Sequence, residues 1–279
     1  MNSIRTNHEI RNTNKMKIAL AQFNIEWENK SANHAKSENF VSTASREGCD
    51  IIIFPEMFNT GFSMNISSIT EDEDGETASI LSRMAKQHSI NIIAGYAVKG
   101  HDEVKGANIA VAYNRKGKRV ARFAKLHPFS FAHEDLYFDA GINTVVFAVD
   151  DIMASIFICY DLRFPEVFRS VAKEVQAVFV LANWPSIRKE HWKTLLQARA
   201  IENQFFVIGV NRTGTDGNGI SYPGASCVFD PLGNECCSGN EKEEFLICKI
   251  NISETSKVRS EYPFLSDMKP FEINLSNKS

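Results

Sequence analysis

Short apolar runs alternate with segments of helical periodicity along most of this chain, and this alternation restricts its possible folds more than any other feature. The runs IIIF (51–54) and AVFVLAN (177–183) have the length and composition of strands covered on both faces. Residues 191–203 carry apolar side chains at helical spacing, whereas 108–125 has the pattern of a hairpin. Helices interleaved with parallel-type and hairpin strands predict an α/β layered fold with mixed sheets.

The chain reads as one domain of 16–279. No repeat of solenoid length is visible in its 279 residues, and no Pro/Gly/Ser-rich linker divides them. The first fifteen residues, MNSIRTNHEIRNTNK, are polar and lack the apolar stretch of a secretory signal. We therefore expect 1–15 to form a disordered extension.

Charge and cysteine usage restrict the partners and the compartment. The formal net charge is −3, so no basic excess indicates nucleic acid or an anionic membrane, and no apolar run reaches the length of a membrane span. Six cysteines at irregular spacing, without a signal sequence, indicate reduced thiols in the cytoplasm. We expect a cytoplasmic protein that acts on a small molecule.

Three chemically active residues stand where predicted strands end. Cys159 closes the run SIFICY, Glu56 follows IIIFP, and Lys125 closes KRVARFAK. A thiol needs a base to become an attacking thiolate, and a desolvated glutamate can act as that base. A lysine ammonium can stabilise the oxyanion of an acyl transfer. Together these residues predict a cysteine-dependent amidase.

Other interpretations of these residues remain open at this point. Each of the three could be structural or solvated by itself, and a Cys/His scheme could use His127, His133 or His191. A metal-dependent hydrolase would need clustered His and carboxylate ligands, and the seven histidines show no such grouping. Pro165 predicts a helix start with Asp161 as its cap, which would lower the pKa of the nearby thiol.

The segments around these residues resemble a known family. FPEMFNTGF, FAKLHPF and FICYDLRFPEVFR are similar, in order and spacing, to the three signature segments of the nitrilase superfamily of carbon–nitrogen hydrolases. The similarity extends over about residues 17–249. The resemblance implies a four-layer αββα sandwich, a homodimer or higher homo-oligomer, and a Glu-Lys-Cys triad that works without a metal or an organic cofactor.

The resemblance also implies a role for each residue. Cys159 would attack the amide carbon, and Glu56 would take the thiol proton and deliver one to departing ammonia. Lys125 and the backbone N–H of Tyr160 would stabilise the oxyanion. Glu134, in FAHEDLYFDAG, matches a second glutamate that helps to position substrate in this family.

Within the superfamily, FPEMFNTGFSM and LANWP…HW…ARAIENQ look most like the ω-amidases, which hydrolyse 2-oxoglutaramate or 2-oxosuccinamate. The carboxylate of such a substrate needs a cation or N–H donors, and Arg163, Arg188 and Tyr160 are the candidates. Trp184 is expected in the pocket wall. The alternatives are an N-carbamoyl-amine hydrolase, an amidase of deaminated glutathione, a nitrilase and a non-catalytic binding module.

Overall fold

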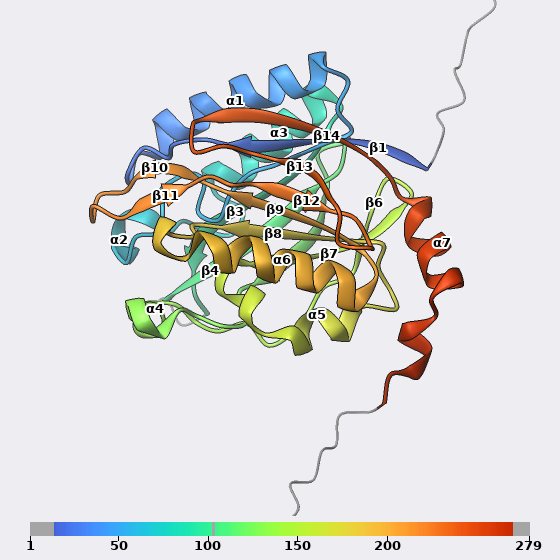
Figure 1. The fold of residues 1–279 in the computed structure, drawn as a ribbon. Coiled ribbons are helices and arrows are strands. Elements are labelled where there is room, and N and C mark those ends of the chain that lie inside the picture. The colour runs from blue at the N-terminus through green and yellow to red at the C-terminus, as the bar shows by residue number, and fades with distance from the viewer. Residues whose placement is uncertain (1–13, 102–103, 270–279) are drawn as a thin grey trace, which may run out of the picture.

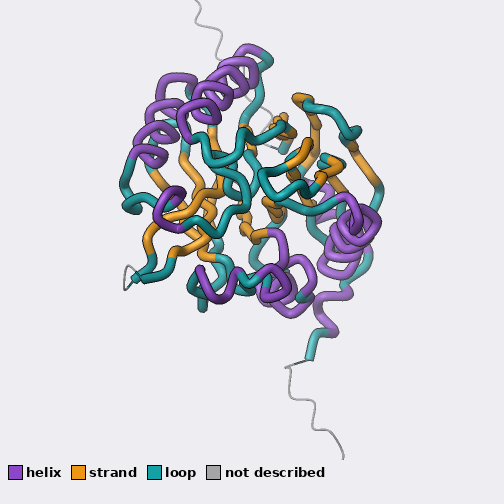
Figure 2. The backbone as a smooth tube through the Cα atoms, turned by 90° about the vertical axis from the view of Figure 1, so that its left-hand side faces the viewer, coloured by secondary structure: helices purple, strands orange, loops and turns teal. Residues whose placement is uncertain are grey.

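Two six-stranded β-sheets lie face to face between outer layers of helices in the computed structural model (Figure 1). The structure describes residues 14–101 and 104–269. In the view turned by 90°, helices flank the strands on both sides (Figure 2). The chain therefore has the α–β–β–α layering of a four-layer sandwich.

The first sheet has its parallel strands in the middle. Its order is β14 (Glu244–Asn251), β1 (Lys15–Gln22), β2 (Ile51–Ile53), β3 (Asn91–Lys99), β4 (Gly106–Tyr113) and β5 (Arg119–Ala124). β1, β2 and β3 are parallel, and the outer pairings are antiparallel. The hairpin expected at 108–125 is β4 and β5.

The second sheet repeats this pattern of pairing. Its order is β13 (Glu235–Ser238), β12 (Cys227–Phe229), β9 (Phe206–Asn211), β8 (Ala177–Ala182), β7 (Ile152–Ile158) and β6 (Phe147–Val149). β7, β8 and β9 are parallel, and the remaining pairs are antiparallel. A separate hairpin is formed by β10 (Thr213–Thr215) and β11 (Ser221–Pro223).

Two helices cover the outer side of each sheet (Figure 1). They are α1 (Lys30–Arg46) and α3 (Glu76–His88) on the first sheet, and α5 (Pro165–Val171) and α6 (Lys189–Asn203) on the second. The short helices are α2 (Ile66–Ile69) and α4 (Glu134–Tyr137), and α7 (Ser253–Glu261) follows β14. Short 3₁₀ helices are η1 (Ser130–Ala132), η2 (Cys159–Arg163), η3 (Ser186–Arg188) and η4 (Phe264–Asp267).

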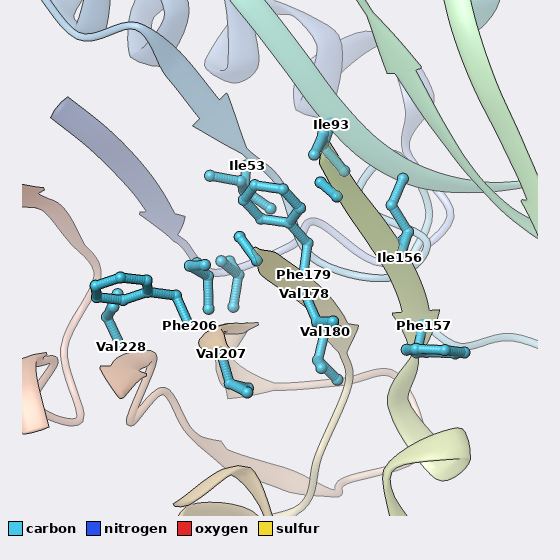
Figure 3. Close-up of a cluster of buried hydrophobic side chains, with 14 of the residues drawn as sticks. Ile53, Ile93, Ile156, Phe157, Val178, Phe179, Val180, Phe206, Val207 and Val228 are labelled. Carbon is cyan, nitrogen blue, oxygen red and sulfur yellow. The ribbon is translucent and has the colours of Figure 1, made fainter. Parts of the chain in front are cut away.

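An apolar core fills the space between the sheets. Ile53 and Ile93 of the first sheet belong to the same buried cluster as Ile156 and Phe179 of the second (Figure 3). All four side chains are at most 1% exposed, and burying one such side chain contributes roughly 1.5–3 kcal/mol. This contact fixes the sheets against each other, so that strand ends from both reach one place.

The structure confirms the α/β sandwich. β1 begins at Lys15, which pairs with Asn251, so this residue of the predicted extension lies in a strand. Residues 1–13, most of the predicted disordered extension, lie outside the described residues, and that extension and the single-domain reading stay predictions. No helix in the described part of the chain is long and apolar enough to cross a membrane.

Candidate active site

Strand ends from both sheets bring the predicted catalytic residues together. Glu56 follows β2, Lys125 directly follows β5, and Cys159 directly follows β7 as the first residue of η2. Glu134 arrives separately, as the first residue of α4. Residues far apart in sequence thus share one site because the two sheets pack with these edges adjacent.

Lys125 binds both glutamates. Its Nζ lies 2.9 Å from Oε1 of Glu56, and 2.8 and 3.1 Å from the two carboxylate oxygens of Glu134. The lysine side chain is 1% exposed, and both glutamate side chains are fully buried. One ammonium between two carboxylates gives these three groups a net charge of −1 when all are ionised.

Two asparagines, neither of them predicted from the sequence, hold the carboxylates in place. Asn108 Nδ2 donates to Glu56 Oε1 at 2.8 Å and to Glu134 Oε1 at 2.9 Å. The backbone N–H of Asn183 donates to Glu56 Oε2 at 2.9 Å, and its Nδ2 donates to the Glu56 carbonyl at 2.6 Å. The sequence feature that could have identified both asparagines is a polar residue in or at the end of an apolar strand, the feature that also drew attention to Cys159.

Cys159 sits on a strained turn beside this cluster. Its φ of 45° lies in the left-handed region, which costs a non-glycine residue of order 1 kcal/mol or more. The thiol contacts the Glu56 carboxylate and lies 3.8 Å from the Asn183 carbonyl oxygen. The turn therefore aims the sulfur at the predicted base.

Cys159 lies at a strand-to-helix turn as expected, but Asp161 is not the cap of the helix that begins at Pro165. α5 does begin at Pro165, but its cap residue is Phe164, and η2 intervenes after Cys159. The Asp161 carboxylate instead accepts hydrogen bonds from Ile158 N at 3.1 Å and from the backbone and ring nitrogens of His127 at 3.0 and 2.8 Å. Asp161 thereby ties the Cys159 turn to the segment after Lys125.

The electrostatics favour an ionised Glu56 beside a protonated Cys159 thiol. Burial alone would raise the pKa of Glu56, but Lys125 and the hydrogen bonds from Asn108 and Asn183 outweigh it and lower that pKa. Burial, and then the Glu56 charge, raise the pKa of Cys159 well above its ordinary value, against the opposing effect of Lys125. The expected lowering of the thiol pKa is therefore also wrong, because burial and the Glu56 charge together outweigh the effect of Lys125.

Burial and neighbouring charges also shift the pKa values of Glu134 and Lys125. Burial raises the pKa of Glu134, and the neighbouring Glu56 carboxylate adds to that rise, while Lys125 opposes it. Burial opposes the charge on Lys125, but Glu134 and Glu56 raise the lysine pKa overall, so the ammonium persists. A positive charge is thus fixed close to the thiol, where an oxyanion would form.

A pocket of about 320 Å³ opens onto Cys159 and Lys125. This is near the lower end of the roughly 300–1,000 Å³ usual for small-molecule sites. Its wall includes four residues named from the sequence, which are Tyr160, Arg163, Trp184 and Arg188. Trp184 is 3% exposed, and its indole N–H donates to the Arg188 carbonyl oxygen at 2.8 Å.

Gly95 allows the strand end that carries Glu56 to approach β3. A Cβ at position 95 would lie 2.9 Å from the Glu56 Cα and 3.2 Å from the Pro55 carbonyl oxygen. Both neighbours are backbone atoms, which cannot rotate away. The absence of a side chain here is what lets Glu56 lie this close to the neighbouring strand.

Two of the three histidines of the alternative Cys/His scheme contact groups other than Cys159 in the described part of the chain. Of the three histidines considered, His127 pairs with Asp161 and His191 Nδ1 lies 3.3 Å from Arg163 Nη2. Among the described residues, no group of three or more His, Cys, Asp or Glu could hold a metal ion. The described groups in contact with the Cys159 thiol are thus those of acid–base chemistry.

Comparisons with known proteins agree with this geometry. Residues 17–260 match the carbon–nitrogen hydrolase family, and the chain belongs to that family. It is therefore a hydrolase of carbon–nitrogen bonds, with the amidohydrolase chemistry of its relatives.

Two curated proteins and one solved structure illustrate how similar the chain is to known members of the family. A 2-oxoglutaramate amidase from Bacillus subtilis (strain 168) is 35% identical over 91% of this chain and 98% of its own length. The omega-amidase YafV from Escherichia coli (strain K12) is 32% identical over 92% and 98%. The crystal structure of XC1258 from Xanthomonas campestris, a CN-hydrolase superfamily protein, has a TM-score of 0.86 and 30% identity, covering 93% of this chain and 99% of its own.

Proposed function

We propose that the protein hydrolyses the terminal amide of a small 2-oxo-dicarboxylate monoamide, such as 2-oxoglutaramate or 2-oxosuccinamate, through a Cys159 thioester. The observation that carries this proposal is the buried cluster in which ionised Glu56 touches both the thiol and Lys125. This arrangement supplies a base, a nucleophile and a fixed cation. The substrate class is carried over from the 2-oxoglutaramate and omega-amidase relatives.

In the first half of the proposed reaction, Glu56 removes the Cys159 proton as the sulfur attacks the amide carbon. The oxygen of the tetrahedral intermediate receives hydrogen bonds from Lys125 and from the backbone N–H of Tyr160. The carbon–nitrogen bond then breaks, and Glu56 passes its proton to the nitrogen, which leaves as ammonia. The product is a thioester, and Glu56 is ionised again.

The second half uses the same groups with water as the nucleophile. Glu56 takes a proton from water, and the resulting hydroxide adds to the thioester carbon. Collapse of this intermediate breaks the carbon–sulfur bond, and the proton on Glu56 returns to the sulfur. Glu134 holds Lys125 throughout, because two of the three lysine contacts are to its carboxylate.

Ammonia release from 2-oxoglutaramate by the purified protein tests this proposal. Glutamine, an N-carbamoyl amine and a simple nitrile are assayed in parallel, with Cys159→Ala as the control. We expect fast release from 2-oxoglutaramate and none from the variant. Turnover of only the carbamoyl amine or the nitrile would support the cysteine chemistry and rule out the proposed substrate class. The thioester is tested separately, by looking for an acyl adduct on Cys159 in the intact-protein mass after an acid quench.

Other predictions about the protein are independent of this assay. A binding module without catalysis would keep its main property in Cys159→Ala, whereas an amidase loses turnover and keeps its fold. The homodimer or higher homo-oligomer implied by the family stays a prediction, which light scattering coupled to size exclusion would test. The cytoplasmic location also stays a prediction.

A further inference from the structure

The pocket wall carries two arginines outside the catalytic cluster. Arg163, in η2, and Arg188, at the end of η3, are both half-buried. Much of the surrounding wall is apolar and includes Phe62, Met64 and Ile187. A cation in apolar surroundings is costly unless an anion or other acceptors compensate it, so the partners of each guanidinium are informative.

Arg163 is held by other parts of the protein. Its guanidinium stacks on the Trp184 ring with 4.9 Å to the centroid, and its Nη2 lies 3.3 Å from His191 Nδ1. Trp184 is in turn anchored through its indole N–H. These contacts make Arg163 a support for the pocket wall.

Arg188 has a fixed backbone and a guanidinium without a polar partner. Its carbonyl oxygen accepts the Trp184 indole N–H at 2.8 Å, which fixes the position of the residue. Its guanidinium lies over the Phe129 ring, 5.4 Å from the centroid, and makes no hydrogen bond or ion pair with any residue in 14–101 or 104–269. All of its N–H donors are therefore available to a ligand.

The ring beneath Arg188 belongs to the catalytic surroundings. The backbone N–H of Phe129 donates to Glu134 Oε2 at 2.6 Å, and the Phe129 ring packs 4.9 Å from that of Tyr160. Phe129 therefore places Arg188 beside the residues that surround the nucleophile. Arg188 and Cys159 line the same pocket, so a ligand whose amide reaches Cys159 can extend toward this guanidinium.

The acidic residue of the pocket wall does not compensate Arg188. Oδ2 of Asp216 accepts the Tyr222 hydroxyl at 2.8 Å, and its Oδ1 accepts the N–H groups of Asn218 and Ile220 at 2.8 and 3.0 Å. These bonds lie within the β10–β11 hairpin and occupy both oxygens. Asp216 thus shapes the hairpin, and Arg188 keeps its full positive charge toward the pocket.

We propose that Arg188 is the residue that receives the carboxylate of an anionic amide substrate, while Arg163 holds the Trp184 wall. This inference rests on the proposed function, since it names the residue that selects its substrate class. A planar guanidinium matches a carboxylate through paired hydrogen bonds, which a lysine cannot reproduce. The contact exists before and during the reaction, so it acts on KM more than on kcat.

The test compares two amides that differ at the end remote from the amide. Glutaramate carries a carboxylate there, and pentanamide carries a methyl group in its place. For Arg188→Gln we expect kcat/KM for glutaramate to fall about 30–100-fold, mainly through KM, with less than about threefold change for pentanamide. Arg188→Lys should lose less on glutaramate, because it keeps the charge.

Lys189→Gln is the matched control. It removes one positive charge from the next residue, whose Nζ pairs with Glu241 at 3.0 Å outside the pocket wall. It should leave kcat/KM for both amides unchanged. Equal losses on both amides in Arg188→Gln, or a selective loss in Arg163→Gln instead, would overturn the assignment.

Protection of the nucleophile gives a second measurement that needs no turnover. Glutarate should slow the alkylation of Cys159 by iodoacetamide in the wild type and in Lys189→Gln, and fail to do so at the same concentration in Arg188→Gln. Equal protection of all three proteins would overturn the proposal. Turnover of glutaramate but not of 2-oxoglutaramate would remove the 2-oxo acid from the proposed function and leave Arg188 in place.

Discussion

Replacing Glu56 by glutamine tests the central electrostatic argument. Glutamine keeps the size of the side chain and can still accept from Asn183 N, but it cannot take the thiol proton. An ordinary cysteine with a pKa of about 8.5 is roughly one-tenth thiolate at pH 7.5. The substitution removes the Glu56 charge, but burial, the largest cause of the raised pKa of Cys159, persists in the variant, so the unassisted thiolate is scarcer still.

The expected loss follows from these two effects. Scarcity of thiolate alone costs at least about tenfold, and removal of a positioned general base typically costs about 10²–10⁴-fold. We therefore expect acylation in Glu56→Gln to fall by at least about a hundredfold at pH 7.5. The fold should persist, because Lys125 keeps both contacts to Glu134.

The pH profile separates the role of base from a merely structural role. The lowered pKa of Glu56 keeps the base ionised throughout the neutral range, so the wild-type rate should be nearly flat from about pH 6.5 to 8.5. In Glu56→Gln the rate should rise about tenfold per pH unit, because hydroxide must now produce the thiolate. The assay is stopped-flow acylation, with iodoacetamide labelling of Cys159 read by peptide mapping. Near-normal turnover, or a flat profile in the variant, would refute the reasoning.

Two further changes test how the site is held. Gly95→Ala should lower kcat/KM by at least about tenfold, because the added Cβ would lie 2.9 Å from the Glu56 backbone. The control is Gly48→Ala, at φ +69° with no atom within 4 Å, which should cost only about 1 kcal/mol of stability and no activity. Equal activities of the two variants would contradict this prediction. Asp161→Asn should destabilise the fold by about 2–3 kcal/mol and lower kcat, because an amide N–H₂ would face an N–H donor; an unchanged melting temperature in thermal denaturation would count against it.

Most of the fold was predictable because its strands are continuous apolar runs. The segment 177–183 became β8, covered on both faces, and 191–203 lies within α6. The short helices in the loop after β5 were missed, because η1 and α4 have three and four residues and leave no periodic signal. They matter, since α4 carries Glu134 into the site.

The composition of the site was predictable, but its electrostatics were not. Chemistry and position at strand ends were enough to select Glu56, Lys125 and Cys159. The sequence could not reveal that Asn108 donates to two carboxylates at once, because this depends on β4 lying beside both. The sequence also does not show how deeply the cluster is buried or what its net charge is. For that reason the predicted pKa of the thiol was lowered, whereas the structure raises it.

The raised pKa of the Cys159 thiol suggests why the site contains two glutamates. A thiolate that is stabilised in the free enzyme would be alkylated by any electrophile that reached it. A neutral thiol beside an ionised base reacts fast only with an electrophile placed so that proton removal and attack occur together. Lys125 favours that position, because its ammonium lies against both carboxylates and its charge interacts with Cys159. Glu134 keeps the cation in place, so that Glu56 remains free to exchange its proton. In the proposed mechanism, Glu134 is thus what allows Glu56 to act as a base.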